Sequence, residues 1–292
     1  MAVAATVLKP CRAAVETEGQ GMPPHYVVAT SQATFGYSRV VAFEITAEQI
    51  DVIQHDAMPM AAYISRPARP GDYPLVLVGA ELWGLTNEVR AVVRDVAALG
   101  YVAIAPNLYH RSGPDTSTGI EESDANRAHA FELLSRLTRD GVEADLRAAA
   151  DYAREHAGAA DRIGMLGFSL GGHVTYFAAT RLPLRAAAIY YPGWLPDAGT
   201  ALSVPDPLLA ATSRITARLT LLFAEQDHVI DADQRRRIGE ALSAASVRHE
   251  IVVYPGARHA FFFPGREPYD KQAADDSWQR VRELFAAELS AG

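Results

Sequence analysis

The chain has one cysteine, Cys11, among its 292 residues. A single cysteine excludes an intrachain disulfide and a zinc site built from several thiolates. Basic residues are also scarce: 27 stand against 35 acidic ones, so the formal charge is −8. Because nucleic-acid binding requires a clustered cationic face, and no long basic run is present, nucleic acid is not an expected partner.

Long apolar runs are missing as well. Lys9 and Arg12 follow a short Ala/Val stretch, but no long apolar segment comes after them. No window approaches the ~18 consecutive apolar residues that a membrane helix needs. We therefore expect a cytoplasmic protein that is neither exported nor inserted into a membrane. Hydrophobic residues make up 49% and charged residues 21%, which is typical of a globular protein with a packed core.

The sequence divides into two parts. Residues 1–45 show no sustained hydrophobic period, and Glu16 to Pro24 are rich in glycine, proline and polar residues. We predict an N-terminal extension or arm there. No internal repeat or interdomain linker follows, so residues 46–292 are predicted to form a single domain, whose length is within the range of one α/β domain.

Short apolar runs alternate with amphipathic segments throughout this domain, which predicts an α/β fold with a mostly parallel sheet and helices on both faces. The expected strands are Met60 to Ser65, Leu75 to Gly79, Val102 to Ala105, Ile163 to Gly167, Ala186 to Tyr190, Leu219 to Ala224 and Glu250 to Tyr254. The expected helices are Asn87 to Leu99, Asp124 to Leu137, Gly141 to His156, Leu170 to Arg181, Asp231 to Ala245 and Tyr269 to Leu289.

A G-x-S-x-G motif occupies residues 167–171, between an expected strand and an expected helix. This setting resembles the nucleophile elbow of α/β-hydrolases, a tight turn that lifts a serine out of the sheet. The flanking glycines avoid clashes across the turn, and the following helix offers its positive end to a developing oxyanion. Ser169 is therefore the candidate nucleophile.

A serine hydroxyl needs a base, and in α/β-hydrolases the order along the chain is serine, acid, histidine. Asp227 and His259 follow two later strands in that order, where residues at the carboxyl ends of parallel strands meet. The sequence leaves alternatives open. His228 is a rival for the base, and Glu225 and Asp231 are rivals for the acid.

The loop Gly79-Ala80-Glu81-Leu82-Trp83-Gly84 follows another strand. The backbone N–H groups of Leu82 and Leu170 are the candidate donors of an oxyanion hole. Glu81 is unusual there, because a carboxylate opposes the negative charge that the reaction creates. Glu81 therefore either points away from the site or takes part in the chemistry.

Together these motifs resemble the dienelactone hydrolase family over about residues 59 to 289. The likeness is carried by the following segments: Glu81-Leu82-Trp83-Gly84, Pro106-Asn107-Leu108-Tyr109 with Arg111, Gly167-Phe168-Ser169-Leu170-Gly171-Gly172, Tyr190-Tyr191, Gln226-Asp227-His228 and His259-Ala260-Phe261. The resemblance implies that Glu81 contacts and helps to activate the nucleophile, and that the substrate is a small lactone. It also makes Arg111 a candidate anchor for a substrate carboxylate, with an ordinary ion pair as the alternative.

The chain departs from that family at three positions. The nucleophile is Ser169 where the family usually has cysteine, Asn107 replaces an aspartate, and Phe263 replaces an arginine four residues after the histidine. A serine cannot rely on thiolate formation, so dependence on His259 is expected to be heavier. The site is predicted to be more apolar and less cationic than a dienelactone site.

We interpret the chain as a hydrolase that cleaves a small ester or lactone through an acyl-enzyme, with no metal or organic cofactor. Candidate pocket walls are Trp83, Tyr109, Tyr191, Trp194 and Phe261 to Phe263. Two alternatives keep the fold: elimination or acyl transfer on a biosynthetic intermediate by the same triad, and a catalytically silent ligand-binding protein. The sequence does not fix the oligomeric state and leaves a homodimer open.

Overall fold

The computed structural model describes residues 26–28, 42–53, 56 and 58–290. In these residues, nine strands form one sheet in the order β1-β9-β8-β7-β6-β4-β5-β3-β2. The strands are β1 (Tyr26–Val28), β2 (Ile45–Ile53), β3 (Met60–Pro67), β4 (Tyr73–Gly79), β5 (Val102–Pro106), β6 (Ala159–Phe168), β7 (Ala186–Tyr190), β8 (Arg218–Gln226) and β9 (His249–Arg258). The β2–β3 and β3–β5 pairs are antiparallel, and all other pairs are parallel.

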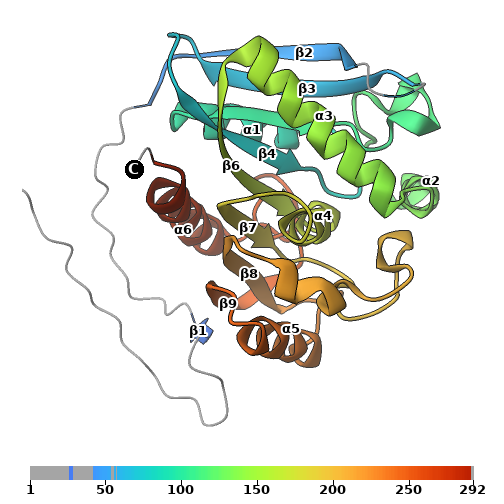
Figure 1. Ribbon diagram of the computed structural model, residues 1–292. Helices are drawn as coiled ribbons and strands as arrows, with labels where there is room; N and C mark the ends of the chain where they lie inside the picture. The colour runs from blue at the N-terminus through green and yellow to red at the C-terminus, as the bar shows by residue number, and fades with distance from the viewer. Residues whose placement is uncertain (1–25, 29–41, 54–55, 57, 291–292) are drawn as a thin grey trace, which may run out of the picture.

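Helices cover both faces of this sheet (Figure 1). They are α1 (Asn87–Ala98), α2 (Asp124–Ser135), α3 (Arg139–Ala157), α4 (Leu170–Ala179), α5 (Ala232–Ala244) and α6 (Lys271–Leu289). Helices α3 and α4 pack against each other and against the centre of the sheet, whereas α1 and α6 pack against strands on its opposite face. The α/β prediction, with a mostly parallel sheet, is confirmed.

Local signals in the sequence explain where these helices begin. Thr86 caps α1 through a bond from the Val89 amide, and Gly100, at φ 97°, follows the end of that helix. The valines of α1 recur at helical spacing and are buried against the sheet. The helices and strands expected from the sequence are all present, with bounds that differ by a few residues.

Two strands were not expected from the sequence. Strand β2 is mostly exposed and mixes polar residues with few apolar ones, so its extended form depends on antiparallel pairing with β3. The three residues of β1 pair in parallel with β9. The rest of the predicted arm, residues 1–25 and 29–41, lies outside the described residues. The division at residue 45 therefore stays a prediction.

The parallel strands bring distant parts of the sequence to one edge. Strand β6 ends at Phe168, β8 at Gln226 and β9 at Arg258. The next residue in each case is Ser169, Asp227 or His259. Because the carboxyl ends of parallel strands lie at the same edge of a sheet, the three side chains enter one region.

Candidate active site

Ser169 stands in a strained turn between β6 and α4. Its backbone has φ 53° and ψ −111°, which side chains other than glycine rarely adopt. The Ser169 amide donates to the Tyr190 carbonyl at 3.0 Å, and the Ser169 carbonyl accepts from the His173 amide at 3.0 Å. The turn is therefore held from both sides, as expected for a nucleophile elbow.

The glycines around Ser169 permit a close approach of backbones. A Cβ atom on Gly171 would lie 2.1 Å from the Gly79 carbonyl oxygen, and one on Gly167 would lie 2.2 Å from the Gly171 carbonyl oxygen. No side chain fits at such distances. Helix α4 consequently begins in direct backbone contact with the end of β4.

His259 links the serine to a carboxylate. Its Nε2 lies 2.9 Å from Ser169 Oγ, and its Nδ1 lies 2.9 and 3.0 Å from the two Asp227 oxygens. Since the carboxylate accepts, Nδ1 carries the hydrogen and Nε2 accepts the serine O–H. The Asp227 side chain is 1% exposed, and its Oδ1 also accepts from the amides of Val229 and Ile230. The acid is thereby fixed in position.

The alternatives that the sequence left open are engaged elsewhere. Glu225 accepts from the Gly256 amide at 2.8 Å. Asp231 caps α5 in a reciprocal capping box with Gln234. The His228 side chain is exposed, and its ring lies 5.5 Å from that of His259. The structure thus brings together Ser169, His259 and Asp227.

Glu81, after β4, is buried beside this group and is 4% exposed. Its carboxylate accepts from Arg266 Nη1 and forms an ion pair with it. Burial raises the pKa of the Glu81 carboxyl, while the positive charge of Arg266 and its hydrogen bond to the carboxylate oppose that shift.

The proposed oxyanion donors are also placed at this edge. Leu170 is the first residue of α4, so its N–H has no partner within the helix. The Tyr109 hydroxyl donates to the Leu82 carbonyl at 3.0 Å and holds that peptide. Tyr109 is 4% exposed and Trp83 is also 4% exposed, so both support the loop rather than line an open pocket.

Residues 60–289 match the model of the dienelactone hydrolase family. The chain belongs to this family. A candidate carboxymethylenebutenolidase from Synechocystis is 34% identical over 244 residues, covering 81% of this chain and 95% of that protein. One from Salmonella typhi is 36% identical over 236 residues, covering 80% of this chain and 84% of that protein.

Solved structures agree with this membership. A candidate dienelactone hydrolase from Klebsiella pneumoniae has a TM-score of 0.75 and 33% identity, covering 83% of this chain and 99% of that one. A dienelactone hydrolase-like promiscuous phosphotriesterase from metagenomic libraries shares the fold, with a TM-score of 0.69 and 19% identity over 84% of this chain and 99% of that one. The chain is therefore a hydrolase of the dienelactone hydrolase family with the α/β-hydrolase fold.

The sequence leaves open whether Arg111, Arg258 or Arg266 enters the site, and it is Arg266 that pairs with the buried Glu81. In this member of the family, Phe263 stands where an arginine was expected, and the Arg266 guanidinium lies 4.6 Å over the Phe263 ring. Arg266 also lies 3.3 Å from Glu122. A cation therefore lies three residues later in the same loop, but two carboxylates pair with it, so the lower positive charge of the site stays a prediction.

Arg111 has a different role from the one that the family resemblance implied. Its guanidinium makes two bonds to Asp145, at 2.7 and 2.8 Å, and lies 2.7 Å from Asp56. The ion-pair alternative therefore describes Arg111, because its hydrogen-bonding capacity is directed at these carboxylates. The candidate anchor for a substrate carboxylate is corrected accordingly.

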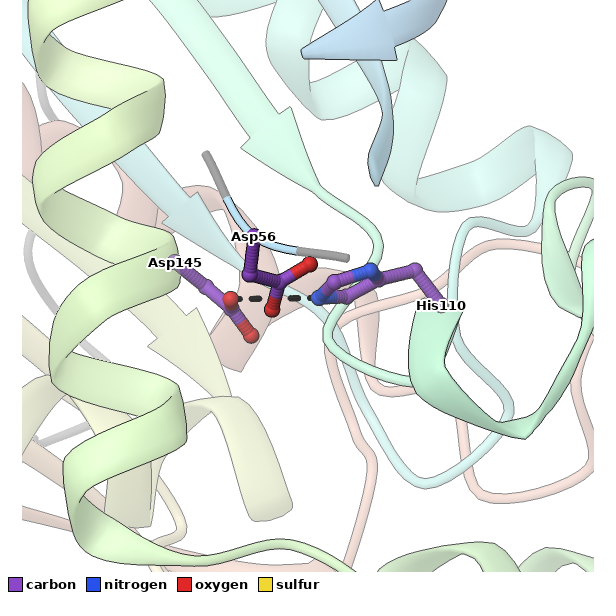
Figure 2. Close-up of side chains that lie close together, drawn as sticks. All are labelled: Asp56, His110 and Asp145. Carbon is purple, nitrogen blue, oxygen red and sulfur yellow. Dashed lines mark hydrogen bonds and ion pairs between the residues drawn. The ribbon is translucent and has the colours of Figure 1, made fainter. Parts of the chain in front are cut away.

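Figure 2 shows Asp56, His110 and Asp145 close together, with His110 Nε2 3.1 Å from Asp145 Oδ1. Each of the three offers one atom suited to a metal ion, and these atoms lie within 4.8 Å of one another. The Arg111 Nη2 atom is 2.7 Å from both Asp56 and Asp145. The guanidinium thus already provides the positive charge of this cluster.

Two other predicted wall residues pack behind Ser169 and His259. The Tyr191 ring lies 5.0 Å from the His259 ring and is fully buried. Phe263 is 2% exposed and packs 4.9 Å from the Phe168 ring. Both residues support His259 and the elbow from the core.

Among the described residues, none of the helices has the length and apolar character needed to span a bilayer.

Proposed function

We propose that this chain hydrolyses a small carboxylic ester or lactone through an acyl-enzyme on Ser169. The observation that carries the proposal is the chain of hydrogen bonds from Ser169 Oγ to His259 Nε2, at 2.9 Å, and from His259 Nδ1 to Asp227, at 2.9 Å. Each of the three residues directly follows a parallel strand, so the sheet itself sets their spacing.

In this proposal Ser169 Oγ attacks the carbonyl carbon while His259 Nε2 takes the hydroxyl proton. The C–O bond to the alcohol then breaks, and the imidazolium returns its proton to the leaving oxygen. Water attacks the acyl-enzyme in the same manner and releases the acid. Asp227 stabilises the imidazolium in both halves of the reaction. A lactone gives one hydroxy acid, because its alcohol and acyl parts are joined.

The negative charge on the carbonyl oxygen needs donors that are already oriented. The amides of Leu82 and Leu170 are proposed for this role, and the positive end of α4 adds to it. Glu81 would oppose that charge if it stood alone. Its pairing with Arg266 removes most of this opposition, which supports Glu81 as part of the site.

The names of the relatives support the substrate class. Carboxymethylenebutenolidases act on a lactone by name, and this chain aligns with two candidates of that name over 80% or more of its length. A serine in place of the family's usual cysteine keeps acyl transfer available, because the adjacent histidine supplies the base that a hydroxyl requires.

The test uses the full chain, p-nitrophenyl acetate and a fluorophosphonate. We expect turnover of the ester, loss of at least about a thousandfold in kcat on Ser169→Ala, and a covalent adduct on the Ser169 peptide by mass spectrometry. Ser290→Ala, on an exposed serine after α6, is the control and should keep the parental rate.

Other outcomes would overturn the proposal in distinguishable ways. No adduct on Ser169 would indicate a silent ligand-binding protein. An adduct without turnover of any small ester would indicate elimination or acyl transfer by the same three residues. Turnover that persists in Ser169→Ala would show that another group is the nucleophile.

A further inference from the structure

Two tryptophans occupy equivalent positions after the two strands that flank β6. Strand β6, which ends beside Ser169, lies between β4 and β7 in the sheet. Strand β4 ends at Gly79 and β7 ends at Tyr190, and a tryptophan stands four residues beyond each end. Trp83 and Trp194 therefore lie in the loops on either side of the elbow.

Helix α2 contacts both of these loops through one face. The Arg127 guanidinium carbon lies 5.7 Å over the Trp83 ring, and the Phe131 ring lies 6.4 Å from the Trp194 ring at an interplanar angle of 69°. Arg127 and Phe131 are four residues apart and so share a face of the helix. Helix α2 thus reaches from the loop after β4 to the loop after β7.

The beginning of α2 is tied to the site as well. Glu122 stands immediately before the N-cap residue Ser123, and its carboxylate lies 3.3 Å from Arg266. Arg266 in turn pairs with Glu81 beside the catalytic group. Contacts from α2 and from the residue before its N-cap therefore reach three loops, those after β4, β7 and β9.

An apolar surface remains open at the far end of this helix. Phe131 is 42% exposed although it is a large apolar side chain, and Trp194 is partly exposed. Single exposed apolar residues are common on proteins. This pair differs because its two rings contact each other and Trp194 lies in the loop after β7, the strand next to the one that ends at the elbow.

The Trp194 side of the pair is held in place by its backbone. Trp194 has φ 59°, a conformation that tryptophan rarely adopts. Its carbonyl accepts from the Ser203 hydroxyl at 3.4 Å, and the preceding Gly193 carbonyl accepts from His173 Nδ1 at 2.8 Å. His173 is on α4, one turn after Ser169. The aromatic wall is therefore fixed relative to the nucleophile before any ligand binds.

We infer that α2 is the cap of the active site and that Phe131 and Trp194 form a specificity wall for a planar apolar ring, such as an aryl group, carried by the ester. This inference rests on the proposed function. It describes how the protein recognises the part of the ester that lies away from the carbonyl. Aromatic rings pack edge to face or offset against such a group, and the two protein rings already stand nearly perpendicular.

The test compares esters that differ only by a ring. Methyl phenylacetate and methyl acetate place or omit the ring on the acyl side, and benzyl acetate places it on the alcohol side. We expect the parent to prefer at least one ring-bearing ester over methyl acetate in kcat/KM. Phe131→Ala should lower that preference about tenfold, the size expected for lost contacts in an apolar pocket. Phe131→Tyr, which keeps the ring, should restore it.

Phe43→Ala is the matched control. Phe43 is also 42% exposed and also packs edge to face on another ring, that of Tyr73 at 5.9 Å, but it lies at the opposite end of β4. Its removal should leave the preference unchanged. An equal loss in Phe43→Ala, or a preference that survives Phe131→Ala, would overturn the inference.

The same experiment separates this inference from the proposed function. Loss of all turnover in Ser169→Ala with an unaltered preference in Phe131→Ala refutes the wall and keeps the esterase. If no ester is turned over, tryptophan fluorescence of the Ser169→Ala protein is titrated with methyl phenylacetate. Binding that weakens about tenfold on adding Phe131→Ala supports the wall, and equal binding refutes it.

Discussion

The guanidinium of Arg266 pairs with the buried carboxylate of Glu81, a residue 185 positions earlier in the chain. Arg266→Met should therefore leave a buried carboxylate without its partner and lower the free energy of unfolding by about 3 kcal/mol. Adding Glu81→Gln should recover most of that loss, since the uncompensated charge is then gone. Denaturant unfolding of the single and double variants measures this coupling.

Arg258→Met is the control for that pair. Arg258 belongs to the same region but is 48% exposed and pairs with an exposed Glu267, so its removal should cost less than about 1 kcal/mol. Additive losses in the Arg266 and Glu81 variants would show that the two side chains stabilise the protein independently.

Asp227→Asn should retain the fold and lose most of the activity. An amide can turn its N–H₂ group toward His259 Nδ1 and so favour the wrong imidazole tautomer, which costs about 10⁴-fold in kcat in an enzyme with this arrangement. Steady-state kinetics on p-nitrophenyl acetate measure the loss. Glu225→Gln, two residues earlier and bonded to the Gly256 amide, should keep the parental rate. A similar loss in both variants would argue against a specific role for Asp227.

His173 should make the protein sensitive to mild acid. Burial lowers its pKa from an ordinary value of 6.5 to about 4. Between these two pH values the unfolded chain binds a proton that the folded protein excludes, so stability falls as pH falls through this window and is fully present above it. The loss between about pH 7.5 and about pH 5 should be roughly 2 kcal/mol.

His173→Asn should flatten this part of the pH dependence, because the titrating group is gone, even if the variant is less stable throughout. Urea unfolding at the two pH values measures the difference. His156→Asn, on a histidine whose side chain is 57% exposed, should keep the parental slope. An unchanged slope in His173→Asn would assign the acid sensitivity to other groups.

Arg111 should exclude divalent metals from the cluster of Asp56, His110 and Asp145. In Arg111→Ala one imidazole and two carboxylates remain within 4.8 Å of one another, a donor set that suits Zn²⁺ or Mn²⁺. Thermal denaturation should then show a rise in Tm with Zn²⁺ for Arg111→Ala and none for the parent. A rise in the parent, or loss of its activity in EDTA, would mean that the native protein uses a metal.

The grouping of Ser169, Asp227 and His259 could be predicted from sequence because its signals are local. The G-x-S-x-G turn needs its glycines at fixed positions, and Asp227 and His259 each follow a strand directly. The choice of Asp227 over Asp231 as the acid could also be supported from the sequence. Asp231 and Gln234 have the spacing of a capping box, which assigns Asp231 to the start of α5.

Other features depend on contacts that no local pattern encodes. The pairing of Arg266 with Glu81 is set by how the loop after β9 returns over the loop after β4. The pairing of Arg111 with Asp145 depends on α3 packing beside the loop that carries Arg111, which no local pattern predicts. Strand β2 has too few apolar residues to be recognised without its partner β3.

The close backbone contact between Gly79 and Gly171 constrains the elbow, whereas the side chains of α2 are free to change. A backbone packed against a backbone has no rotamers to exchange, so the spacing of the Leu82 and Leu170 amides does not adapt to a new side chain. Helix α2 carries Phe131 on an exposed face, where substitutions are tolerated. New substrate preferences in this lineage should therefore arise by changes in α2 and the loop of Trp194, while the elbow stays the same.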